Sequence, residues 1–111
     1  MNTLVKNLPL SEAVNLAGLV NIEPGKIISR TFVQRPEVTV TLFSFGAGEG
    51  VSTDSAPGDA IVQILEGEAK ITIGGNPLIA KTGDIVVMPA NIPHAVDAEQ
   101  DFKMLLTVVN H

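Results

Sequence analysis

Cysteine is absent from the sequence, and histidine occurs only twice, at positions 94 and 111. Without cysteine the chain cannot form a disulfide, a thiolate nucleophile or a Cys-ligated zinc or iron–sulfur site. His94 is therefore the one internal side chain of the type that most often does acid–base or metal chemistry near neutral pH. The chain has almost no other group that could do chemistry near neutral pH.

Long apolar runs are also missing. No stretch reaches the roughly eighteen consecutive apolar residues of a membrane-spanning helix. The first ten residues, MNTLVKNLPL, lack the basic start and the apolar segment of a signal peptide. We therefore expect a cytoplasmic protein with no membrane segment.

Basic residues are few and scattered. Seven Lys and Arg stand against twelve Asp and Glu, which gives a formal net charge of −5. A chain without a basic stripe has no means of neutralising a row of phosphates, so nucleic acid is not an expected partner. The length of 111 residues suits one domain with its own core. We expect a single domain over residues 1–111, with an N-terminal arm over 1–26 and a barrel over 27–109.

One short segment near the N-terminus has a helical pattern, with Ser11 as a cap and residues 12–19 as the helix, although Gly18 weakens it. The rest of the chain favours strands, because short β-branched apolar stretches alternate with clusters of Gly, Pro, Asn and Asp. This pattern predicts an all-β antiparallel sandwich or barrel. The expected strands are residues 26–33, 38–45, 60–65, 69–73, 84–89 and 102–109.

Two of these stretches allow the faces to be assigned. If Val62 and Ile64 point inward, the two-residue period of a strand sends Gln63 to the opposite surface, toward solvent or a dimer partner. The run from Ile85 to Met88 is apolar without interruption, which indicates a strand buried on both faces.

Polar and small residues recur at fixed spacings in two segments, which end in glycine and in histidine respectively. The first segment starts at the end of one expected strand and runs into the next one. The second follows a Gly-Asp turn and contains two prolines. In the first segment the residues are Gly48, Asp54, Ala56, Ala60 and Gly67, separated by five, one, three and six residues. In the second they are Gly83, Pro89, Asn91 and His94, separated by five, one and two residues.

These spacings resemble the two signature motifs of the cupin superfamily. In that family the first motif carries His, His and Glu at the positions held here by Asp54, Ala56 and Ala60. The second motif carries a glycine where Asn91 stands and the fourth ligand where His94 stands.

The resemblance covers roughly residues 27–109 and implies a double-stranded β-helix, a jelly-roll barrel whose open end holds the site. The physics of the second segment agrees with this placement. Pro89 and Pro93 cannot donate to a strand ladder, so the strand has to end or bulge there. His94 then follows a stiff arch at a barrel rim, where a side chain can meet a ligand.

The resemblance implies a metal site that is degenerate in this chain. Imidazole suits several divalent transition metals, but a catalytic centre normally needs about three protein ligands. Ala56 and Ala60 cannot ligate, so only Asp54 can join His94, and two ligands bind a metal weakly. Asp59 is one residue from the lost glutamate, and a one-residue shift on a strand points to the other face. We expect no cofactor, with a weakly held divalent metal on His94 and Asp54 as the alternative.

Two further interpretations of His94 stay open. It can hydrogen-bond a nearby backbone carbonyl or Asp54 and so hold the arch in place, or it can be the polar anchor of a small-molecule pocket with apolar walls. Five residues are candidates to line such a pocket, and the alternative is that they are ordinary core residues. They are Phe43, Val62, Ile64, Met88 and Met104.

Two classes of function follow. The first is a cupin-like module that binds a small molecule in the barrel beside a degenerate metal site. The second is a small enzyme, an isomerase, cyclase or dioxygenase-like protein, that uses Asp54 and His94 on a weakly held metal or as an acid–base pair. Proteins that resemble this one commonly form dimers through barrel faces, so we expect a homodimer that buries the outward apolar residues of 26–33 and 38–45.

Overall fold

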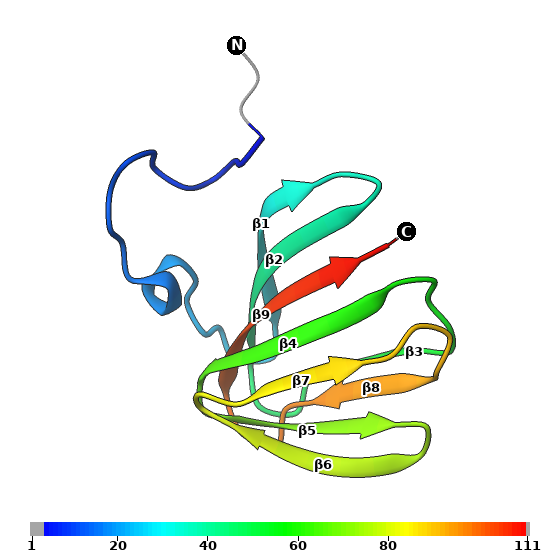
Figure 1. Cartoon of the computed structure of the whole chain (residues 1–111). Helices are drawn as coiled ribbons and strands as arrows, with labels where there is room; N and C mark the ends of the chain where they lie inside the picture. Colours follow the sequence, from blue (N-terminus) through cyan, green and yellow to red (C-terminus); the bar gives the residue numbers. More distant parts are fainter. Residues whose placement is uncertain (1–3, 111) are drawn as a thin grey trace.

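The computed structural model describes residues 4–110 and is almost wholly β, as the sequence predicts (Figure 1). Residues 1–3 of the expected N-terminal arm, and His111, lie outside this range. Over residues 4–110 the elements are η1 (Leu16–Leu19), β1 (Ile27–Gln34), β2 (Val38–Phe45), β3 (Gly50–Thr53), β4 (Asp59–Glu66), β5 (Glu68–Ile73), β6 (Asn76–Lys81), β7 (Ile85–Met88), β8 (His94–Asp97) and β9 (Phe102–Val109).

The strands form two antiparallel sheets with the strand order of a jelly roll. One sheet has five strands in the order β1-β2-β9-β4-β7, and the other has four in the order β3-β8-β5-β6. Each sheet sends alternate side chains into one shared core, with Val62 and Ile64 from the first sheet and Ile71 and Val96 from the second, all at most 2% exposed. The predicted double-stranded barrel is therefore confirmed.

Two aromatic rings lie at the centre of this core. The rings of Phe45 on β2 and Phe102 on β9 are stacked, with centroids 4.6 Å apart and an interplanar angle of 16°. Both side chains are 0% exposed, and their residues are partners in the β2–β9 register. Phe43 adds a tilted contact to Phe45 with a centroid distance of 6.0 Å, so the rings fix the packing between β2 and β9.

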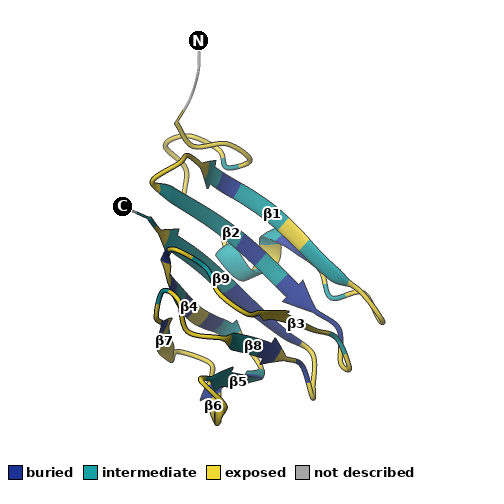
Figure 2. Cartoon of the chain, turned by 90° about the vertical axis from the view of Figure 1, so that its right-hand side faces the viewer, coloured by how far each residue is buried: buried dark blue, intermediate teal, exposed yellow. Residues whose placement is uncertain are grey.

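All six expected strands are present as β1, β2, β4, β5, β7 and β9, but the sequence interpretation missed β3, β6 and β8. These three are short and lie among the turn residues. β3 and β6 are the edge strands of the four-stranded sheet. Pro77 is tolerated in β6 because an edge strand has a side without ladder hydrogen bonds. Figure 2 shows β3 as exposed along its length.

The prediction that residues 85–88 are buried on both faces is wrong. Ile85 is 63% exposed and Val87 is 52% exposed, whereas Met88 is buried and Val86 packs against the core. The reason is that β7 is an edge strand of the five-stranded sheet, whose outer face is uncovered there. Gln63 points to the same outer face and is exposed, as predicted.

The short N-terminal helical element is confirmed, but it is a single 3₁₀ turn over Leu16–Leu19 instead of a helix over 12–19. Asn15 caps it in place of Ser11, since its side-chain oxygen accepts a hydrogen bond from the Gly18 backbone N–H at 3.2 Å. Ser11 lies in a turn with a φ of 60°. Within residues 4–110 no helix has the length and apolarity needed to cross a membrane.

The N-terminal arm packs on the outer face of β1, β2 and β9. Its Val20 joins Phe32 and Leu42 in a second buried cluster, which Leu16 and Leu19 extend. The cluster lies outside the barrel. The arm therefore covers the apolar outer face of these strands.

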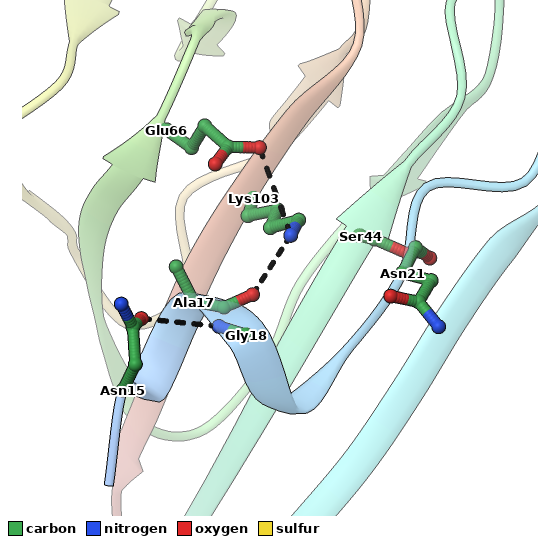
Figure 3. A network of polar contacts seen from close by, with 7 residues as sticks. All are labelled: Asn15, Ala17, Gly18, Asn21, Ser44, Glu66 and Lys103. Carbon is green, nitrogen blue, oxygen red and sulfur yellow. Dashed lines mark hydrogen bonds and ion pairs between the residues drawn. The ribbon is translucent and has the colours of Figure 1, made fainter.

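Two polar side chains of the sheet hold this arm (Figure 3). Lys103 is 9% exposed, and its Nζ donates to the Ala17 carbonyl oxygen at 2.8 Å and lies 3.6 Å from a carboxylate oxygen of Glu66. Ser44 is fully buried, and its hydroxyl donates to the Asn21 carbonyl oxygen at 2.8 Å. These bonds satisfy buried polar groups that would otherwise destabilise the face.

The arm covers the face that the sequence offered for a dimer, because the outward side chains of β1 and β2 belong to the arm's cluster. Two adjacent rows of uncharged residues on the same sheet start beside that cluster, in which Leu105 takes part, and extend away from it. They run across β9, β4 and β7, and we call them the uncharged rows. One consists of Leu105, Gln63 and Ile85, and the other of Thr107, Ile61 and Val87.

Candidate functional site

The two motif segments meet at one end of the barrel. The connection from β3 to β4 and the connection from β7 to β8 lie at the same end as the β5–β6 turn (Figure 1). The Asn91 backbone N–H donates to the Ala56 carbonyl oxygen at 2.8 Å, and the Gly74 N–H donates to the Pro93 carbonyl oxygen at 2.8 Å. Three connections far apart in the sequence are thus joined into one rim.

Proline and asparagine shape the second segment as the sequence predicts. β7 ends at Met88, directly before Pro89, and β8 begins at His94, directly after Pro93. Asn91 has a φ of 63°, in the left-handed region that glycine enters most easily. Asparagine is among the few other residues that tolerate this conformation, so it can replace the family's glycine without loss of the arch.

The rim holds a pocket of about 190 Å³ that is open to solvent. Side chains from both motif segments and from the β5–β6 region surround it. Its lining residues are Ser52, Thr53, Asp54, Thr72, Gly75, Pro93, His94 and Ala95.

The pocket lies at the end of the four-stranded sheet, where residues from rows on both faces line it, His94 being in the row of Thr53 and Ile73. Ser52 and Thr72 are both partners of Ala95, so the three form a row across β3, β8 and β5. In the neighbouring row Val96 and Ile71 point into the core. Since successive residues of a strand face opposite sides, the row of Ser52, Ala95 and Thr72 faces away from the core.

His94 lies where β8 begins and is half-buried. Its Nδ1 lies 3.3 Å from the Ile92 carbonyl oxygen, which can only accept a hydrogen bond. The proton of a neutral imidazole therefore belongs on Nδ1, and Nε2 keeps its lone pair for another group. This is the backbone contact that the sequence offered as one role of His94, and it leaves the second nitrogen available for a ligand.

Asp54 follows the last residue of β3 and is exposed. Over residues 4–110 no ion pair joins it to a basic side chain. Asp54 and His94 come from different motifs, 40 positions apart in the sequence, and both line the same pocket. The two residues that the sequence offered as a pair therefore line one pocket, and their part in binding stays a prediction.

Ser52, Thr53 and Thr72 were not anticipated from the sequence. Ser52 and Thr53 lie in β3, a strand that the sequence pattern missed. Thr72 lies in β5, which the pattern predicted without showing which strands it pairs with. Their alternation within the strands was readable, but only the pairing of β3 and β5 with β8 brings them beside His94.

The apolar residues proposed as a ligand-lining wall lie between the sheets instead. Val62, Ile64, Met88 and Met104 are at most 3% exposed and belong to the core, and Phe43 packs against it. None of the five lines the rim pocket. A ligand could touch them only by displacing core packing, and their part in binding stays a prediction.

The residues at the family's metal positions do not fit a metal centre of that kind. The methyl groups of Ala56 and Ala60 have no donor atom. Asp59, the carboxylate next to Ala60, accepts a hydrogen bond from the Ala90 N–H at 2.7 Å and so joins β4 to the β7–β8 connection. In the described part of the chain no group of three or more His, Asp or Glu side chains is placed to hold a metal ion.

Comparisons with known proteins agree with this fold. The family profile described as "Cupin domain" matches residues 41–110. Among curated proteins there is no match to this chain.

Among the solved structures that are similar to this chain, three cover most of it at more than 30% identity. A conserved protein of unknown function from Streptococcus pyogenes is 40% identical, with 99% of this chain and 96% of that chain covered and a TM-score of 0.95. A cupin superfamily protein from Desulfitobacterium hafniense is 34% identical, with 96% and 98% covered and a TM-score of 0.90. A cupin 2 conserved barrel domain protein from Leptotrichia buccalis is 47% identical over 87% of this chain, which spans only 47% of that longer protein, with a TM-score of 0.84.

Proposed function

Since the chain belongs to the cupin family, and since its two motif segments meet at one open pocket, we propose that it binds a small molecule at this rim through His94 and Asp54. The observation that carries the proposal is that residues of both motif segments, among them His94 and Asp54, line one pocket together with Ser52, Thr53 and Thr72. A concave site with a few directed polar groups is the usual form of a small-molecule site.

The size of the pocket limits the ligand. Pockets for drug-sized molecules measure roughly 300–1,000 Å³. At about 190 Å³ the rim pocket is smaller. This supports a small metabolite-sized ligand held mainly by polar contacts, because none of the buried core side chains is among the lining residues.

Binding can be tested with a panel of small hydroxy, amino and carboxy compounds in a thermal-shift assay. A compound that binds the native protein raises its melting temperature by mass action. Both His94→Gln and Asp54→Asn are expected to abolish that rise, because each removes one of the two directed groups. Glu99→Gln is the matched control, since it removes an exposed carboxylate outside the pocket lining.

The proposal would be overturned if no compound stabilises the wild type. It would also be overturned if the same compound stabilises His94→Gln and Asp54→Asn as strongly as the wild type.

We also propose that the rim works without a tightly bound transition metal. The alanines at two of the family's four ligand positions support this, because two remaining ligands bind weakly. Elemental analysis of protein purified without chelator or affinity metal is expected to find well under one transition-metal ion per chain. Near-stoichiometric metal that is lost in His94→Ala and Asp54→Ala would contradict this, and would favour the enzyme alternative.

We further propose that two copies of the chain pair through the uncharged rows. Each copy carries a net charge of −5, so two copies repel one another over most of their surfaces. A two-fold interface brings the same patch of both copies together, and an uncharged patch meets itself without like charges. Ile85 and Val87 supply exposed apolar area there, which supports an interaction surface.

Light scattering at tens of micromolar tests the assembly. The wild type is expected at about twice the chain mass of 11.6 kDa, and the double variant Ile85→Glu with Val87→Glu at the mass of one chain. Ile79→Glu is the control, because Ile79 is 51% exposed but lies on β6 in the other sheet. A wild type of monomer mass, or a dimer unaffected by the double variant, would refute this interface.

A further inference from the structure

Resting on the proposed function, we infer that the rim ligand carries a cationic nitrogen, in the simplest case a primary ammonium group, which Asp54 receives. The polar groups of the pocket, the tautomer of His94 and the charge around the rim lead to this class of ligand.

Most polar side-chain atoms of the pocket are acceptors. An ionised carboxylate such as that of Asp54 can only accept hydrogen bonds, and hydroxyls such as those of Ser52 and Thr72 can accept as well as donate. Lysine and arginine, the side chains that only donate, are absent from the lining among the described residues. A ligand that complements this set has to bring donors.

His94 also lines the pocket, and a neutral imidazole has one acceptor nitrogen. Its Nδ1 is directed to the Ile92 carbonyl oxygen, so the neutral ring presents the lone pair of Nε2 elsewhere. An ammonium group has three N–H donors and can bond a carboxylate and a second acceptor at once. Charge-assisted hydrogen bonds of this kind are shorter and stronger than neutral ones.

The charge around the pocket also favours a cation over an anion. On the outer face of β5 the nearest basic residue toward the middle of the sheet is Lys70, and its register partner is Asp97. Among the described residues neither Lys70 nor Asp54 takes part in an ion pair. With a net charge of −5 on the whole chain, an anionic ligand meets repulsion at the rim and a cationic one meets attraction.

Three compounds of nearly equal size test the inference: ethanolammonium, ethylene glycol and glycolate. They share a two-carbon, hydroxyl-bearing skeleton and differ in one end group that is cationic, neutral or anionic. Backbone amide NMR at low salt follows each titration into the millimolar range, and the shifts of residues 52–54, 72–75 and 93–95 report on the rim. Ethanolammonium is expected to bind about tenfold more tightly than ethylene glycol, the worth of one charged hydrogen bond. Glycolate is expected to be the weakest.

Asp54→Asn keeps the shape of the side chain and removes its charge. In this variant ethanolammonium is expected to bind only as weakly as ethylene glycol, whereas Glu99→Gln is expected to leave its affinity unchanged. If ethylene glycol or glycolate binds the rim as tightly as ethanolammonium, or if Asp54→Asn keeps the full preference, the cationic ligand class is wrong and the proposed rim site stands. If none of the three moves the rim amides, both proposals fail.

Discussion

Replacement of Phe102 by alanine is expected to lower the free energy of unfolding by about 3–5 kcal/mol, the usual cost of removing a buried ring. Phe102 is 0% exposed, and its ring is stacked on that of Phe45 with a centroid distance of 4.6 Å. The substitution removes the ring's burial, its stacking partner and part of the contact between β2 and β9. Because β9 lies between β2 and β4 in the five-stranded sheet, the cavity opens where the sheet cannot easily collapse.

Urea unfolding measures this loss, and Phe43→Ala is the matched control. Phe43 is half-buried and touches Phe45 in a tilted arrangement at 6.0 Å, so its truncation is expected to cost less than that of Phe102. Phe102→Leu is expected to recover part of the stability if the alanine variant does not fold. A loss below about 1 kcal/mol for Phe102→Ala, under the range for buried rings, would show that the two rings do not organise the core.

Replacement of Gly67 by alanine is expected to cost about 3 kcal/mol or more, more than the 1–2 kcal/mol of an unfavourable backbone conformation alone. Gly67 joins β4 to β5 with a φ of 78°, in the left-handed region. An added Cβ would meet the Asp101 backbone carbonyl oxygen and would lie 3.1 Å from the Phe102 Cβ. These atoms lie directly before and at the start of β9 and cannot move aside like the end of a flexible side chain.

Gly83→Ala separates the two causes. Gly83 has a φ of 93°, but a Cβ there would have no heavy atom within 4 Å among those considered. Its substitution is expected to cost only the backbone share of about 1–2 kcal/mol. Urea unfolding measures the free energy of unfolding of both variants. Equal losses would mean that β9 shifts to accommodate the added Cβ, and that the close approach at Gly67 does not require glycine.

The long strands were predictable because they carry their own signals. β2 and β4 are β-branched, have a two-residue period and end at glycine, and each of these features acts within a few residues of sequence. β3 and β8 have only four residues each, and they form because neighbouring strands offer hydrogen bonds. A strand of this kind is specified by its partners, which a local pattern does not contain.

Edge position explains the error at β7. An uninterrupted apolar run is typical of a strand covered on both faces. Here the outer side chains of Ile85 and Val87 face solvent in the single chain, because nothing in the described arm extends beyond the cluster around Leu42. The apolar sequence indicated a strand that favours burial, but it could not show that one face of this strand lies open in the single chain.

The candidate site was predictable in part. The spacing of the motifs and the family resemblance identified Asp54 and His94 and the loss of ligands at Ala56 and Ala60, since these depend only on positions in the sequence. The outer-face row that contains Thr72 depends on the register between β5 and β8, which a one-residue slip would reverse. The sequence suggested an apolar pocket inside the barrel, whereas the structure has an open pocket at the rim. The rim pocket could not be predicted because its lining depends on strand pairing.

The most direct test of a rim site is a backbone amide chemical-shift map of the whole chain with the compound that raises the melting temperature most. The largest changes are predicted at residues 52–54, 72–75 and 93–95, around His94 and Asp54. Largest changes at Phe43, Val62 and Met104 instead, with the rim unmoved, would place the ligand between the sheets and contradict the proposed site.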